Sequence, residues 1–119
     1  MQIVLVAVLG AAGALARYGL GSWLGGSSFP WTTLGINVAG CFVLGWLLVW
    51  GPDHLDERVA TGVGIGFLGA FTTFSTFGVE SHRLLRDDRP AAALTYVALS
   101  VVLGVAAAAV GYWVARRAA

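Results

Sequence analysis

Four long apolar stretches, separated by short connectors, dominate this 119-residue chain. They cover residues 3–24, 31–50, 59–79 and 91–115. A helix needs about 20 mostly apolar residues to cross the roughly 30 Å of hydrocarbon in a membrane, and each stretch reaches that length. Only 11% of the residues are charged, whereas a soluble domain carries about 25% and uses them to cover its water-facing surface. The sequence therefore predicts one all-α integral membrane domain over residues 1–119, with four transmembrane helices in the cell membrane.

The composition excludes several other classes of protein. The net charge is +1 and no run of Arg is long enough to form a nucleic-acid surface, so no nucleic-acid partner is expected. The chain has no Lys, so it lacks the Gly-Lys-Ser/Thr phosphate loop of an ATP-driven transporter. Cys41 and His54 have no second ligand or catalytic partner and are interpreted as structural. No nucleophile lies beside a base in the stretches, so an enzyme is not expected. The first three residues carry no positive side chain, so a cleaved leader peptide is not expected either.

The arginines outside the apolar stretches are balanced between the two sides of the membrane. An even number of spans places the N-terminus, the second connector and the C-terminus on one side, and the other two connectors on the other. Each side then carries three arginines: Arg58, Arg116 and Arg117 on the first, and Arg83, Arg86 and Arg89 on the second. Because orientation follows the Lys and Arg bias of short loops, this tie predicts insertion in both directions and pairing as an antiparallel dimer.

Four polar residues stand out in the first, second and fourth stretches, because polar groups inside a membrane are costly and suggest a function. Arg17 lies about 10 Å from the far end of the first stretch at 1.5 Å per residue, so it could anchor at the interface or line a pore mouth. Asn37 could serve a pathway or only link helices by hydrogen bonds. Tyr96 and Ser100 are four residues apart and could line a pathway or satisfy each other and the backbone.

The third stretch combines clustered glycines with hydroxyl side chains near its middle, around Gly69. The hydroxyl residues are Thr72, Thr73, Ser75 and Thr76. This pattern is typical of a helix that breaks where the freed backbone groups line a cavity or meet partners. Phe74 and Phe77 are three residues apart and share one face of a helix. We predict a break near residues 69–72.

Neutral donors dominate the polar groups of the stretches, and none of the stretches contains Asp or Glu. Glu80 and His82 follow the third stretch and are expected to be solvated end groups. A pathway with hydrogen-bond donors, aromatic edges and no acid suits a small anion, because the edge of a Phe ring is positive. The residues therefore indicate an anion pathway without naming the anion.

Three motifs resemble the Fluc (CrcB) family of fluoride channels. They are Gly10-x-x-Gly13-Ala14-x-x-Arg17-Tyr18, Thr33-Leu34-x-x-Asn37-x-x-Gly40 and Gly66-Phe67-Leu68-Gly69-Ala70-Phe71-Thr72-Thr73-Phe74-Ser75-Thr76-Phe77. The third is the most specific, and the resemblance covers essentially the whole chain in length, span count and motif order.

The resemblance implies a passive fluoride channel that exports toxic fluoride from the cytoplasm. It implies an antiparallel homodimer in the bilayer, or a heterodimer with a paralogue, and a central structural Na⁺ that is not transported. Its Na⁺ ligands would be the backbone carbonyls of Gly69 and Thr72. The fluoride pathway would include Phe74, Phe77, Asn37, Tyr96, Ser100, Thr73 and Ser75. Arg17 and Glu80 are candidates for a vestibule.

The main alternative is a small dual-topology antiporter for drugs or other cations. Such a protein is also built from four spans, but it needs a buried carboxylate for proton coupling, and the first stretch has none.

Overall fold

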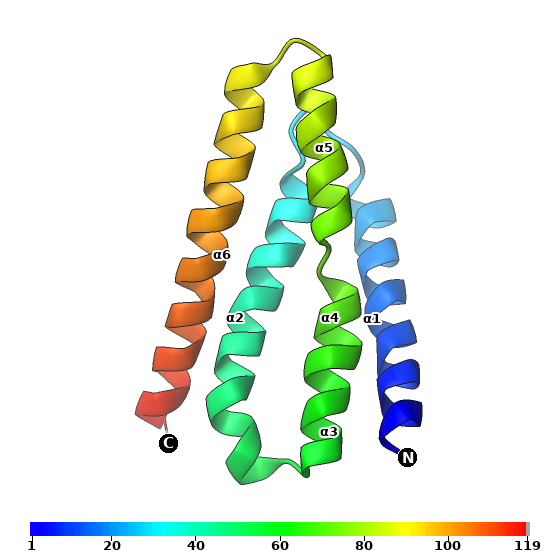
Figure 1. Cartoon of the computed structure of the whole chain (residues 1–119), viewed down its shortest axis with the longest axis vertical. Coiled ribbons are helices and arrows are strands. Elements are labelled where there is room, and N and C mark those ends of the chain that lie inside the picture. Colours follow the sequence, from blue (N-terminus) through cyan, green and yellow to red (C-terminus); the bar gives the residue numbers. More distant parts are fainter. Residues whose placement is uncertain (119) are drawn as a thin grey trace.

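The computed structural model describes residues 1–118 and contains four long helical rods, which confirms the expected all-helical fold (Figure 1). The first, second and fourth rods are α1 (Gln2–Leu24), α2 (Trp31–His54) and α6 (Pro90–Ala118). The third rod is divided into α3 (Glu57–Thr61), the π-helix η1 (Gly62–Leu68), α4 (Gly69–Phe71) and α5 (Phe74–Arg86). Each rod is long and apolar enough to cross a membrane.

Three of the rods extend past the apolar stretches from which they were predicted. The second rod continues to His54, the third to Arg86 and the fourth to Ala118. The added turns carry polar and charged side chains such as Asp53 and Arg83. Hydropathy marks the apolar middle of each helix, whereas the backbone hydrogen bonds continue into the polar ends.

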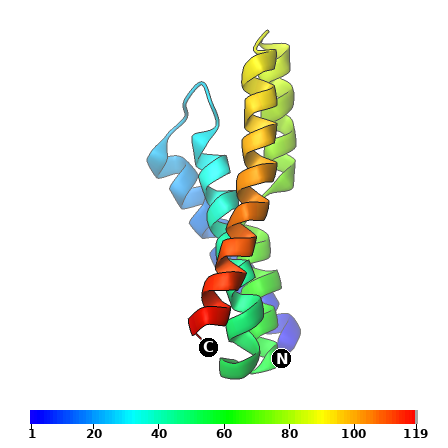
Figure 2. The same cartoon turned by 90° about the vertical axis from the view of Figure 1, so that its left-hand side faces the viewer.

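The rods lie side by side in a slab whose principal extents are 49 × 31 × 20 Å. Across the slab the order is α6, α2, the third rod and α1 (Figure 1). The turned view shows how thin the slab is and how α5 and α6 project together beyond the connection between α1 and α2 (Figure 2). So thin a molecule buries few side chains. Its main buried cluster joins α2, α5 and α6 through Leu34, Leu84, Ala93 and Tyr96.

Glycines allow two pairs of helices to approach closely. A Cβ atom at Gly45 of α2 would collide with the carbonyl of Ala108 in α6, and one at Gly111 would collide with the carbonyl of Phe42. A Cβ atom at Gly13 of α1 would likewise collide with the backbone of Phe67. Close backbone contact through small residues is how membrane helices gain packing energy. These contacts join α2 to α6 and α1 to the third rod.

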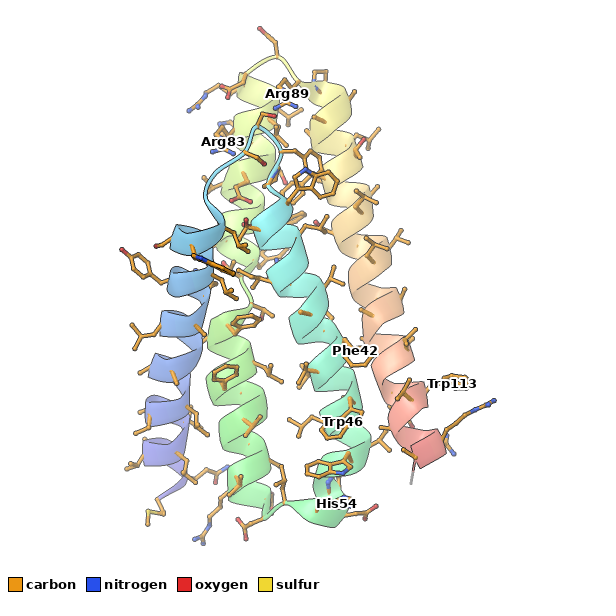
Figure 3. The ribbon with its side chains drawn as sticks, turned by 180° about the vertical axis from the view of Figure 1, so that it is seen from behind. Phe42, Trp46, His54, Arg83, Arg89 and Trp113 are labelled. Atoms are coloured by element: carbon orange, nitrogen blue, oxygen red, sulfur yellow. The ribbon has the colours of Figure 1, made fainter. Side chains whose placement is uncertain are left out.

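Both termini lie at the same end of the slab, as an even number of crossings requires (Figure 1). Arg116 and Arg117 occupy the last turn of α6 at that end, and Arg58 lies in α3 nearby. Arg83 and Arg89 lie at the opposite end, away from Trp113 and His54 (Figure 3). The arginines of the two ends therefore follow the three-to-three division expected from the sequence.

Candidate functional site

The third rod breaks in its middle, at Thr72 and Thr73. Thr72 has φ −81° and ψ 160°, and Thr73 has φ −150° and ψ 121°, so both residues are extended. The predicted break is present, and it begins at the end of the predicted region, because Gly69 is still helical with φ −62° and ψ −37°. The π-helix that precedes the break was not predicted.

Thr73 starts the helix that follows the break. Its Oγ1 accepts a hydrogen bond from the N–H of Thr76 at 3.2 Å and donates to Thr76 Oγ1 at 3.0 Å. Thr is a favourable residue at this position, because its side chain satisfies an N–H group that has no partner within the helix. Ser75 is exposed, with its Oγ 3.3 Å from Thr73 Oγ1. Thr73, Ser75 and Thr76, three of the four expected hydroxyl residues, thus lie at the start of α5.

Asn37 of α2 braces the break with two hydrogen bonds. Its Nδ2 donates to the carbonyl of Thr73 at 3.0 Å, and its Oδ1 accepts from the N–H of the same residue at 2.8 Å. A side-chain amide offers a donor and an acceptor side by side, so it can replace the helical partners that an extended residue loses. Asn37 therefore links two helices and also holds the break.

Arg17 of α1 reaches the break from the other side. Its Nε donates to the carbonyl of Ala70 at 3.1 Å, and the side chain is half-buried. This contact does not favour the interpretation of Arg17 as an interface anchor. The guanidinium points instead to the carbonyl of Ala70, a backbone group freed by the break.

The carbonyls of Gly69 and Thr72 lose their ordinary helical partners. In an unbroken helix the N–H groups of Thr73 and Thr76 would donate to them. Those two groups donate instead to the side chains of Asn37 and Thr73. Both carbonyls belong to residues that line a cavity beside the break. In residues 1–118 no cluster of three or more His, Cys, Asp or Glu side chains lies together.

The cavity beside the break has a volume of about 330 Å³. It is lined by Asn37, Thr72, Thr73, Phe74, Phe77 and Ser100, and by Cys41 and other small or apolar residues. The structure thus gathers most of the expected pathway residues around one space. This cavity is lined by neutral hydrogen-bond donors and aromatic rings, and no carboxylate side chain of residues 1–118 lines it.

Three aromatic side chains form a row that starts at this cavity. The ring centroids of Phe74 and Phe77 are 5.6 Å apart, and those of Phe77 and Tyr96 are 5.3 Å apart. Phe74 is 83% exposed, although it lies in the middle of the third rod. Its ring therefore lies at the surface of the slab, at the edge of the cavity that it lines.

The expectation that Glu80 is a solvated end group is wrong. α5 continues past residue 79, so Glu80 is half-buried between helices. Its Oε1 accepts a hydrogen bond from Thr33 of α2 at 3.0 Å, and its Oε2 accepts from Tyr96 of α6 at 2.8 Å. Thr33, 8% exposed, was quoted above only as the first residue of a motif and was given no role. The available signal was a hydroxyl inside an apolar stretch, four residues before Asn37.

A second cavity of about 500 Å³ lies between α1, α2 and α5. Arg17 and Glu80 both line it, and it shares Thr73 with the first cavity. The two vestibule candidates therefore face one polar space. Tyr96 is fully buried and lines neither cavity, and it reaches the second one only through its hydrogen bond to Glu80.

The chain matches a family model described as CrcB-like protein, Camphor Resistance (CrcB), over residues 4–112. It is 47% identical over 117 residues to a protein of Symbiobacterium thermophilum named Fluoride-specific ion channel FluC 1, covering 93% of this chain and 94% of the relative. It is 41% identical over 122 residues to Fluoride-specific ion channel FluC of Acidobacterium capsulatum, covering 98% of both. It is 36% identical over 107 residues to FluC 2 of Listeria innocua, covering 88% of this chain and 83% of the relative. With four helices able to span a membrane, the chain is a multi-pass protein of the cell membrane, and it belongs to the CrcB-like family.

Proposed function

We propose that this chain conducts fluoride passively across the cell membrane and so exports fluoride from the cytoplasm. The observation that carries the proposal is the braced break, where Asn37 and Thr73 exchange two hydrogen bonds beside a cavity lined by neutral donors and Phe rings. The relatives named as fluoride-specific ion channels support the choice of anion. Transport of this kind requires no bond to form or break, so the chain is not an enzyme.

Fluoride is small and holds its water tightly, so a pathway must offer several donors at once to replace that water. Ser100 offers a hydroxyl beside the cavity, and Asn37 offers the Nδ2 hydrogen that does not bind Thr73. Phe74 and Phe77 offer ring edges, which carry partial positive charge. A narrow pathway lined in this way favours fluoride over the larger chloride. Fluoride enters acidified cells as neutral HF and is trapped as the anion, so the membrane potential alone can drive its exit.

The proposed assembly is an antiparallel homodimer, with a paralogue heterodimer as the alternative. Two observations support a partner: the slab is thin, and the cavity that Phe74 lines is open at its surface. The equal number of arginines at the two ends supports insertion in both orientations. In such a pair, Phe74 of each copy would meet the cavity of the other.

A structural Na⁺ is proposed at the break, and the residues present fit it. The carbonyls of Gly69 and Thr72 lack their helical donors, and an antiparallel copy would contribute the same two oxygens. A hard monovalent cation suits such a set of uncharged oxygens. When bound, the ion would offset the partial negative charge of converging carbonyls. Thr72→Ser should retain it, because the backbone oxygen is the ligand.

The sodium proposal is tested by replacing Na⁺ with a large organic cation and measuring both fluoride efflux from liposomes and the fraction of dimer. We expect both to fall and to recover when Na⁺ is restored. Unchanged efflux and an unchanged dimer fraction, with depletion verified, would contradict the proposal.

A proton-coupled antiporter is the second candidate, because Glu80 supplies a half-buried carboxylate. The two proposals differ in what drives transport. Liposomes loaded with potassium fluoride and treated with valinomycin should lose fluoride without any pH gradient if the chain is a passive channel. Transport that needs a pH gradient, and that is abolished by Glu80→Gln, would favour the antiporter.

A further inference from the structure

The connection between α1 and α2, residues 25–30, is called loop 1 here. It begins with Gly25 at φ 72° and Gly26, and a Cβ atom at either glycine would meet no neighbour within 4 Å. Glycine leaves the backbone free to adopt many conformations, so residues 25 and 26 do not by themselves determine the conformation of the loop. The contacts that fix loop 1 therefore come from its second half, where Ser27 Oγ and the N–H of Trp31 both donate to the carbonyl of Phe29.

One long-range polar contact holds loop 1. Nη1 of Arg89, in the turn before α6, donates to the carbonyl of Ser28 at 2.7 Å across 61 positions of sequence. Arg89 is itself held, because its N–H donates to the carbonyl of Leu84 at 2.8 Å and its carbonyl accepts from Ala93 at 3.0 Å. Arg89 lies at the same end of the molecule as Arg83 (Figure 3).

The next residue of loop 1 packs on Tyr96. The ring of Phe29 meets that of Tyr96 edge to face, with centroids 5.6 Å apart at 80°, and it also packs on Trp31 at 4.5 Å. Edge-to-face contact is a favoured arrangement of two aromatic rings. Phe29 is half-buried against the cluster that contains Tyr96.

Tyr96 is therefore held between loop 1 and the break. Phe29 lies on one side of its ring and Phe77 on another, and its hydroxyl donates to Glu80. The side chain is fully buried, although it follows a turn at the end of the molecule. Without Phe29, one side of the ring would lose its cover.

We infer that Arg89 and Phe29 are positioning residues: Arg89 holds loop 1 over Tyr96, and Phe29 keeps the Tyr96 hydroxyl on Glu80. The inference rests on the proposed function where it concerns fluoride, because Tyr96 and Glu80 would then act at one end of the pathway. Without either residue, loop 1 loosens, the Tyr96 ring becomes accessible and fluoride flux falls.

The test measures the position of Tyr96 separately from transport. Arg89→Ala and Phe29→Ala are compared with Arg86→Ala in the purified full chain. Arg86 is exposed and pairs with Asp87 in the same turn. Arg86→Ala therefore removes one positive charge from the same end of the molecule as Arg89→Ala does, and changes the arginine balance equally. It leaves the contacts of loop 1 unchanged. Nitration of tyrosine by tetranitromethane is quantified by peptide mass spectrometry, with exposed Tyr18 and Tyr112 as internal references. Fluoride efflux from liposomes is measured on the same samples.

We expect Tyr96 to resist nitration in the parent chain and in Arg86→Ala, and to become several-fold more reactive in Arg89→Ala and Phe29→Ala. Efflux should fall several-fold in those two variants, and Arg89→Lys should restore part of the protection of Tyr96. Continued protection of Tyr96 in both alanine variants, or full exposure with normal efflux, would overturn the inference. A parent chain that shows no fluoride efflux, with nitration as expected, would remove the proposed function and leave the positioning of Tyr96 standing.

Discussion

Asn37 and Thr73, which lie on different helices and 36 positions apart, exchange two hydrogen bonds at the centre of the molecule. The amide of Asn37 replaces the helical hydrogen-bond partners of Thr73. It accepts from the N–H of Thr73 and donates to the carbonyl of the same residue. The third rod can therefore leave the helical conformation in the middle of its length without leaving these two backbone groups unpaired.

Asn37→Leu should destabilise the chain, because it leaves the N–H and the carbonyl of Thr73 without partners. The expected cost is about 1–3 kcal/mol for each unsatisfied group. Unfolding by sodium dodecyl sulfate in mixed micelles measures the free energy, and a Leu variant as stable as the parent would contradict the bracing role.

Phe74→Ile and Phe77→Ile should each reduce fluoride efflux strongly and leave the oligomeric state unchanged. Isoleucine keeps an apolar side chain and removes the polarised ring edge. Phe42→Ile is the matched control, because Phe42 lies on α2 outside the cavity, towards the end with Trp113 (Figure 3). Normal efflux in both pathway variants would mean that the two rings only pack.

Gly45→Ala should destabilise the pairing of α2 with α6, because the added methyl would collide with the carbonyl of Ala108. Forcing a methyl into such a contact costs about 1–3 kcal/mol. Gly35→Ala in the same helix is the control: its Cβ has open space, so the variant should be neutral or more stable by up to about 1 kcal/mol. Equal stabilities of the two variants in the micelle assay would contradict the close contact.

A cysteine placed at a tagged terminus should be labelled from both sides of the membrane in intact cells and inverted vesicles, in a Cys41→Ser background. The equal arginine count predicts about equal insertion in the two orientations. Labelling from one side only would contradict the homodimer and favour a paralogue as partner.

The four helices could be predicted from the sequence because about 20 apolar residues in a row leave few alternatives to a membrane span. The break could be predicted from glycines next to hydroxyl residues, and it begins at the end of the predicted region. Its extension to Thr73 could not be predicted, since Thr73 is held by Asn37 from another helix. The wrong prediction that Glu80 is a solvated end group also arose because its hydrogen-bond partners lie on other helices. Its partners, Thr33 and Tyr96, come from two other helices, and hydropathy along one segment carries no information about them.

The role of the neutral donors and rings as a pathway stays a prediction. Asn37, Phe74 and Ser100 line one cavity with others of the predicted set, whereas Ser75 and Tyr96 line neither cavity. The contact of Arg89 with loop 1 and the row of rings from Phe74 to Phe29 depend on how the ends of α5 and α6 meet the first connector. Such contacts join residues tens of positions apart, so no local sequence pattern predicts them.

The central claim is that this chain selects fluoride and lets it pass without energy coupling. The most direct measurement loads liposomes containing the purified protein with equal fluoride and chloride, clamps the potential with valinomycin, and follows both anions with ion-selective electrodes. We predict rapid loss of fluoride, retention of chloride, and no loss of either anion from liposomes without protein. Loss of both anions at similar rates, or retention of fluoride by correctly assembled protein, would contradict the account.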